Sequence, residues 1–96
     1  NSADITNITV NGVAISGVTF PVAFGDGASG VSDQLGASYT VIISYSGASS
    51  DYVRVIDTDS NDACTNAIGT SRTFNSQVTN GPIGIMYITM GDGTCV

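Results

Sequence analysis

The sequence predicts an all-β protein, folded as a two-layer antiparallel β-sandwich of about six to eight short strands. Three observations lead to this prediction. Val, Ile, Thr and Tyr are plentiful, whereas Lys and Glu are absent, so strong helix formers are scarce. Apolar and polar residues alternate along several segments. Gly, Asn and Pro recur between these segments at intervals of roughly ten residues. A β-barrel is the alternative architecture, and at most one or two helical turns are expected.

The clearest strand pattern lies in residues 37–46, with the sequence ASYTVIISYS. Every second residue from Ala37 to Tyr45 is apolar or aromatic, and the residues between them are Ser or Thr, except for Ile42. A strand that buries one face and exposes the other to water has this period of two. The segment is therefore expected to be a half-buried strand on which the rest of the sheet is built.

The N-terminal part predicts a β-hairpin. Asp4–Val10 is the expected first strand, and Asn11-Gly12 is a strong hairpin signal because both residues tolerate positive φ. Val13–Phe20 is the expected returning strand. Pro21 cannot donate to a ladder, so the chain is expected to run along a sheet edge or to change sheets there.

The glycine-rich segment Gly25–Gly36 is the longest expected loop, with one helical turn that Ser32 could cap. Further on, Gly47–Ser50 has the composition of a tight turn. The next strand, Asp51–Thr58, is then expected to pair antiparallel with residues 37–46. One of its faces carries Val side chains and the other carries Tyr and Ile side chains, so the pattern leaves open which face points into the core.

The C-terminal part contains two further expected strands. Ser60–Gly69 is irregular in pattern, and Asp62 could cap a short helical turn there. Thr70–Val78 is a polar and therefore peripheral strand. Ile83–Met90 is the last strand, and it is apolar on both faces.

A strand that is apolar on both faces needs cover on the side that faces away from the core. A loop of the same chain or a neighbouring subunit could supply this cover. The chain is expected to form one domain over residues 1–96, in which residues 1–10 could be exchanged with a neighbour by β-strand addition. The side chains assigned to a subunit interface are Ile5, Ile8, Val10, Met86, Ile88 and Met90.

The two cysteines, Cys64 and Cys95, indicate one disulfide in a small secreted chain. The start at Asn1 without Met agrees with a processed, secreted chain or an excised domain. An intramolecular bridge would close a loop of about 30 residues and stabilise the fold by roughly 3–4 kcal/mol. A bridge between subunits is the alternative.

The charge balance excludes several classes of function. The net charge is −6 with only two arginines, which cannot supply the basic surface that nucleic acid or anionic lipid requires. No apolar run approaches the roughly 20 residues of a membrane-spanning helix. Since His and Lys are absent and no Ser or Asp has a marked partner, no catalytic site is recognisable, and we expect a protein that is not an enzyme.

One acidic segment has the spacing of cation ligands. Asp57, Asp59, Asn61 and Asp62 begin like a calcium-binding loop, in which alternating oxygen ligands surround a hard cation. Asp62 occupies the position where such loops carry a Gly, and Ile68 the position of a bidentate Glu, so the segment is not an EF-hand. A loose calcium site and an ordinary solvated turn both remain open. No other cofactor is expected.

The segments ITVNGV, SYTVIISYSG, DYVRVIDT and GDGTC are similar in style to immunoglobulin-like sandwich modules of bacterial surface proteins and extracellular filament subunits. The Cys–Trp–Cys pattern of antibody domains is absent, since the chain has no Trp. The resemblance implies a structural subunit that assembles with copies of itself outside the cell, through β-strand and apolar face contacts. The alternative is a monomeric binding module of the adhesin or virion-decoration type.

Overall fold

Strands make up most of the chain that the computed structural model describes, namely residues 4–23, 27–33, 38–57, 62–77, 84–92 and 95. They are β1 (Ile5–Val10), β2 (Val13–Ala14), β3 (Ala28–Ser32), β4 (Tyr39–Asp57), β5 (Asp62–Gln77) and β6 (Gly84–Asp92). Within these residues no helix is long and apolar enough to cross a membrane.

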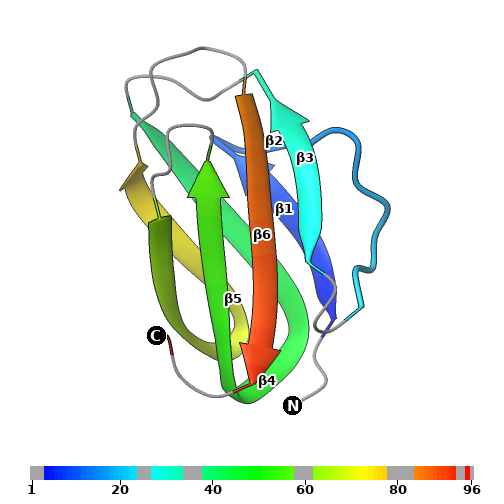
Figure 1. Ribbon diagram of the computed structural model, residues 1–96, viewed down its shortest axis with the longest axis vertical. Coiled ribbons are helices and arrows are strands. Elements are labelled where there is room, and N and C mark those ends of the chain that lie inside the picture. Colours follow the sequence, from blue (N-terminus) through cyan, green and yellow to red (C-terminus); the bar gives the residue numbers. More distant parts are fainter. Residues whose placement is uncertain are drawn as a thin grey trace.

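The strands form two packed layers of four strand segments each, which confirms the predicted antiparallel sandwich (Figure 1). The first sheet has the order β2, β1, the first half of β4 and the second half of β5. The second sheet has the order of the first half of β5, the second half of β4, β6 and β3. Because β4 and β5 pass through both layers, all six strands belong to one hydrogen-bonded network.

The long strand β4 replaces the turn that the sequence predicts at residues 47–50. The two halves of β4 do not pair with each other; both pair with β5. The register shifts twice at the corner, and more residues of β4 than of β5 lie between the pair Ser44↔Ser71 and the pair Asp51↔Ala67. Bulges of this kind let a paired strand bend without losing its partner, which is why a turn-like composition here does not end the strand.

The strand β5 also corrects a prediction, because it contains residues 62–68, for which a helical turn was expected. It bends at Gly69, whose φ of 70° lies in a region that glycine adopts easily. Arg72 spans this bend, since its Nε donates to the carbonyl oxygen of Asn66 at 2.8 Å. The backbone pairing with β4 outweighs the local capping signal of Asp62. The predicted peripheral position is confirmed, because β5 pairs only with β4 among the described strands.

The predicted hairpin at Asn11-Gly12 is confirmed. Both residues have positive φ, 50° and 80°, and Val10 pairs with Val13. The returning strand β2 is shorter than predicted. Beyond it, the chain pairs once with β3, at Ser16↔Val31, and once with β1, at Ile5↔Val22. The segment between these contacts therefore crosses from the second sheet to the first, as the position of Pro21 suggested.

The strand β3 lies inside the segment predicted to be a loop, residues 25–36. Its inner positions are Ala28, Gly30 and Ser32, and Gly30 is covered by Ile15. A Cβ on Gly30 would lie 2.8 Å from Cδ1 of Ile15, so the strand needs a glycine here. Small inner residues give almost no hydrophobic alternation, which explains why the pattern indicated a loop. The expected helical turn after Ser32 extends outside the described residues.

The core lies between the two sheets and includes the odd-numbered positions of β4 on both sides of its corner. Ile42 points outward with 39% of its surface exposed, as the alternation predicted. In the second half of β4 the valines point inward, which settles the question that the sequence left open. The largest fully buried side chains are Tyr39, Ile5, Ile8, Ile43, Met86, Ile88, Met90, Val10, Val41, Val53 and Val55.

A buried polar pair joins the two ends of β4 across the core. The hydroxyl of Tyr39, at the start of β4 in the first sheet, donates to Oδ2 of Asp57, at its end in the second sheet. Tyr39 is 1% exposed and Asp57 is 5% exposed. Since a buried carboxylate is costly without hydrogen-bond donors, this contact favours one arrangement of the two sheets.

The predicted intramolecular disulfide is confirmed. Cys64 on β5 is bonded to Cys95, 31 positions later, with their Cα atoms 6.0 Å apart. The bridge ties the segment that follows β6 to the edge strand of the second sheet, so it crosses over β4 between them.

We expect Tyr39→Phe to lower the free energy of unfolding by about 1–3 kcal/mol, because the buried carboxylate of Asp57 loses this donor. Urea denaturation followed by circular dichroism measures the change. Tyr87→Phe is the matched control, since Tyr87 is 41% exposed and its change should stay within about 0.5 kcal/mol. Equal losses in the two variants would contradict the role of the buried pair.

Replacing both Cys64 and Cys95 by Ala should lower the free energy of unfolding by roughly 3–4 kcal/mol, since the unfolded chain regains the entropy of an open loop. The same denaturation experiment with and without a thiol reductant provides the control. The reductant should destabilise the wild-type protein by a similar amount and leave the double variant unchanged. A wild-type protein that is insensitive to complete reduction would contradict the prediction.

Candidate functional site

The side chains that the sequence analysis assigned to a subunit interface lie in the core of the single chain. Ile8, Val10, Met86 and Ile88 are 0% exposed, Met90 is 1% exposed and Ile5 is 2% exposed. The strand β1 pairs with β2 and β4 of its own chain. We therefore correct this assignment: these side chains hold the two sheets together, and any surface that contacts a partner must be formed by other residues.

The opposite face of β6 points outward, together with the alternate residues of its neighbours. The register places Ile56 of β4 opposite Tyr87 of β6, and Arg54 opposite Thr89. On the other side of β6, Tyr87 lies opposite Ser29 of β3. We call this surface the outer face of the second sheet, and its described members are Tyr52, Arg54, Ile56, Asp62, Cys64, Asn66, Tyr87, Thr89, Ser29 and Val31.

Three apolar side chains form a row across this face. Val31 is 42% exposed, Tyr87 is 41% exposed, and Ile56 is partly buried. Ile56 and Tyr87 are direct cross-strand neighbours, and Val31 is the diagonal neighbour of Tyr87 on β3. Side chains in these positions are close enough to contact each other. The row therefore presents a band of apolar surface to solvent on three adjacent strands.

Two tyrosines of this face lie against glycines, which fixes the direction of their rings. A Cβ on Gly91 would lie 2.6 Å from Cε2 of Tyr52, and a Cβ on Gly27 would lie 2.8 Å from Cζ of Tyr87. Each ring therefore covers bare backbone on the neighbouring strand or just before it. This packing places both rings against backbone atoms, which restricts the positions that they can take.

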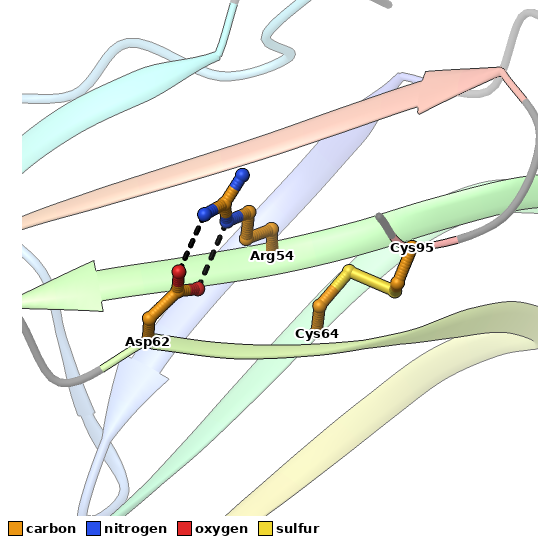
Figure 2. A network of polar contacts seen from close by, with 4 residues as sticks. All are labelled: Arg54, Asp62, Cys64 and Cys95. Atoms are coloured by element: carbon orange, nitrogen blue, oxygen red, sulfur yellow. Dashed lines mark hydrogen bonds and ion pairs between the residues drawn. A yellow bond between two sulfur atoms is a disulfide. The ribbon is translucent and has the colours of Figure 1, made fainter.

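Near β5 on the same face, Arg54 forms a bidentate salt bridge with Asp62, beside the disulfide (Figure 2). Nε of Arg54 donates to Oδ1 of Asp62 at 2.9 Å, and Nη2 donates to Oδ2. These hydrogen bonds, followed by the positive charge of Arg54, lower the pKa of Asp62, and they raise the pKa of Arg54. The positive charge on this face is therefore neutralised within the face.

The structure gives two of the four residues of the calcium hypothesis other roles. Asp57 is buried and accepts the hydroxyl of Tyr39, while Asp62 binds Arg54 on the surface. Asp59 and Asn61 lie outside the described residues. Among the residues that the structure describes, no three acidic, cysteine or histidine side chains gather as metal ligands.

A groove of about 400 Å³ lies at the opposite edge of the second sheet, beside β3. It separates the start of β3 from the crossing segment that follows β2. The described residues of its lining are uncharged: Gly17, Val18, Thr19, Pro21, Val22, Ala23, Gly27, Ala28 and Ser29. Much of this lining is backbone or small side chains, so main-chain groups define the chemistry of the groove.

We expect the pKa of Asp62 to lie below that of an ordinary aspartate, because Arg54 donates hydrogen bonds to its charged form. A pH titration followed through the carboxyl carbon by NMR measures it. Arg54→Gln should raise the pKa of Asp62 to its usual range, whereas Arg72→Gln, whose arginine binds the Asn66 carbonyl, should leave it unchanged.

A folded-state pKa below the unfolded value means that this contact stabilises the fold above the unfolded pKa of about 3.9. The contribution is lost as the pH falls through the folded pKa. A pKa of Asp62 that is the same in wild-type protein and in Arg54→Gln would contradict the contact.

No protein-family model matches the chain, and the searches of curated proteins and of solved structures gave no significant match. The similarity to immunoglobulin-like modules therefore stays a prediction from the sequence. The candidate surfaces are defined by this chain's own geometry: the outer face of the second sheet and the groove beside β3.

Proposed function

We propose that the protein is a structural subunit of an extracellular assembly, in which copies contact one another through the outer face of the second sheet. The observation that carries the proposal is the row of Val31, Tyr87 and Ile56 across three strands. Burial of this row against another molecule would remove its apolar surface from water, which favours association.

The two-faced strand β6 supports the same proposal. Its inner side chains fill the core, while Tyr87 on the outer side keeps 41% of its surface exposed to solvent in one chain. Thr89 and Gly91 extend this side toward the end of the strand. A neighbouring copy provides the cover that such a strand needs.

The disulfide supports an extracellular location. Structural disulfides persist in oxidising compartments and are rare in the cytosol. The Cys64–Cys95 bridge therefore supports a secreted chain. The rings that pack against Gly27 and Gly91 suit a permanent contact, because side chains that are already restricted lose less entropy when they are covered.

The alternative function is a monomeric binding module of the adhesin or virion-decoration type. The observation that favours it is that, among the described residues, β1 pairs with β2 and β4 of its own chain and its apolar side chains are buried there. In this case the outer face of the second sheet would contact a different protein. The two functions differ in whether purified copies associate with one another.

Sedimentation velocity over a range of concentrations, with negative-stain electron microscopy of the same samples, tests the proposal. We expect the wild-type protein to assemble, and Val31→Ser to weaken assembly by about tenfold, because an aliphatic side chain of this size contributes roughly 1.5 kcal/mol or more when fully buried.

The matched control is Ile42→Ser. Ile42 is 39% exposed, close to the 42% of Val31, but it lies on the outer face of the first sheet. This variant should assemble like the wild type. A wild-type protein that remains a 9.7 kDa monomer at every concentration would refute the structural function and favour the binding module.

A further inference from the structure

The segment Asn7-Ile8-Thr9 has the acceptor pattern of N-linked glycosylation. It is the one place in the sequence where an Asn is followed two residues later by Ser or Thr, with a residue other than Pro between them. Secreted proteins carry N-linked glycans at this pattern, and the folded chain must then leave the Asn side chain exposed to solvent. The pattern lies in β1, so the geometry of this strand decides whether a glycan fits.

A bulge in β1 presents Asn7 to solvent. Ile5 pairs with Tyr45 and Asn7 pairs with Ser44, so β1 has one extra residue, Thr6, between these two pairs. Such a bulge interrupts the alternation of a strand, and Thr6 and Asn7 are both exposed. Among the described residues, no hydrogen bond holds the side chain of Asn7. Its amide nitrogen is therefore accessible for a covalent attachment.

Hydroxyl side chains dominate the surface around Asn7, which is the outer face of the first sheet. Its described members next to Asn7 in the register are Thr9, Ile42, Ser44, Ser71 and Thr73. Hydroxyl groups donate and accept hydrogen bonds, as sugars do. Ile42 is the diagonal neighbour of Asn7 across β1 and β4, and it is 39% exposed. A sugar on Asn7 would therefore have hydroxyl partners and an apolar side chain within reach.

We propose that Asn7 carries an N-linked glycan. In the transfer, Nδ2 of Asn7 bonds to C1 of the first sugar of a lipid diphosphate-linked oligosaccharide. The bond between C1 and the diphosphate oxygen breaks, and the amide proton leaves with the lipid diphosphate. Thr9 supplies the hydroxyl of the acceptor pattern. The Cys64–Cys95 disulfide supports passage through an oxidising secretory compartment, where such a transfer takes place.

The glycan would lie on the layer opposite to the proposed contact surface. Asn7 is on the outer face of the first sheet, whereas Val31, Ile56 and Tyr87 are on the outer face of the second sheet. A bulky, hydrated glycan therefore hinders close contacts through the first sheet and leaves the second sheet accessible. This inference goes beyond the proposed function and shares with it only the extracellular location.

Mass spectrometry of the protein from its native source tests the proposal. Cleavage before Asp4 and Asp26 releases one fragment that contains Asn7 and Asn11. We expect the mass of this fragment to exceed that of its sequence by the mass of an oligosaccharide. Fragmentation of the chain should place the sugar on Asn7 and distinguish it from spontaneous deamidation of Asn11. A fragment without sugar, or a sugar on another residue only, would overturn the inference.

Two substitutions of Thr9 provide a matched pair in a secreting cell that performs N-linked glycosylation. Thr9→Ser keeps the hydroxyl of the acceptor pattern, whereas Thr9→Val removes it and keeps a β-branched side chain that suits a strand. We expect Thr9→Ser to carry the glycan and Thr9→Val to lose it completely. A glycan that persists in Thr9→Val would contradict the assignment to this pattern.

The outcomes separate this inference from the proposed function. A glycosylated protein that remains monomeric would refute the assembly and leave the glycan on Asn7 standing. A protein that assembles without a sugar on Asn7 would refute the glycan and leave the assembly standing.

Discussion

The fold depends on one constraint: β4 and β5 must stay paired while both bend from one sheet into the other. The odd-numbered residues of β4 face the core both before the corner, from Tyr39 to Tyr45, and after it, from Val53 to Asp57. The bulges in β4 and the positive φ of Gly69 in β5 take up the bend. The Arg72 hydrogen bond across the bend of β5 and the Tyr39–Asp57 hydrogen bond across the core then stabilise this bent arrangement.

Much of this fold is predictable from alternation alone. The alternation in residues 37–46 predicts which side chains of β4 are buried. Asn11-Gly12 predicts the hairpin between β1 and β2. Both signals are local in the sequence. The continuity of β4 through residues 47–50 and of β5 through residues 62–68 is not local: small and polar residues there resemble turns or caps. Only the pairing between these two consecutive strands, which the local composition does not reveal, makes them extended. The strand β3 was hidden for a related reason, since Gly30 contributes no hydrophobic signal where Ile15 covers it.

The candidate surface illustrates a limit of pattern analysis. A strand that is apolar on both faces indicates that its outer face is also covered, but the period of two does not show which face points into the core. The answer depends on the register with β3 and β4, which turns Met86, Ile88 and Met90 inward and leaves Tyr87 outside. The groove beside β3 had no sequence signal, because it arises where the chain fails to continue a pairing that began at Ser16.

The disulfide between β5 and the residue after β6 also determines how the molecule would carry tension. A pull on the chain beyond Cys95 reaches the fold through the sulfur bridge at Cys64, not through the end of β6. The second half of β5 and all of β6 then lie in a closed covalent loop that no force applied along the chain can lengthen. Only the chain before Cys64 can be drawn out, and because this part includes β3 and β4, the strands on both sides of β6 would be pulled away while the residues from Cys64 to Cys95 stay linked as one closed loop.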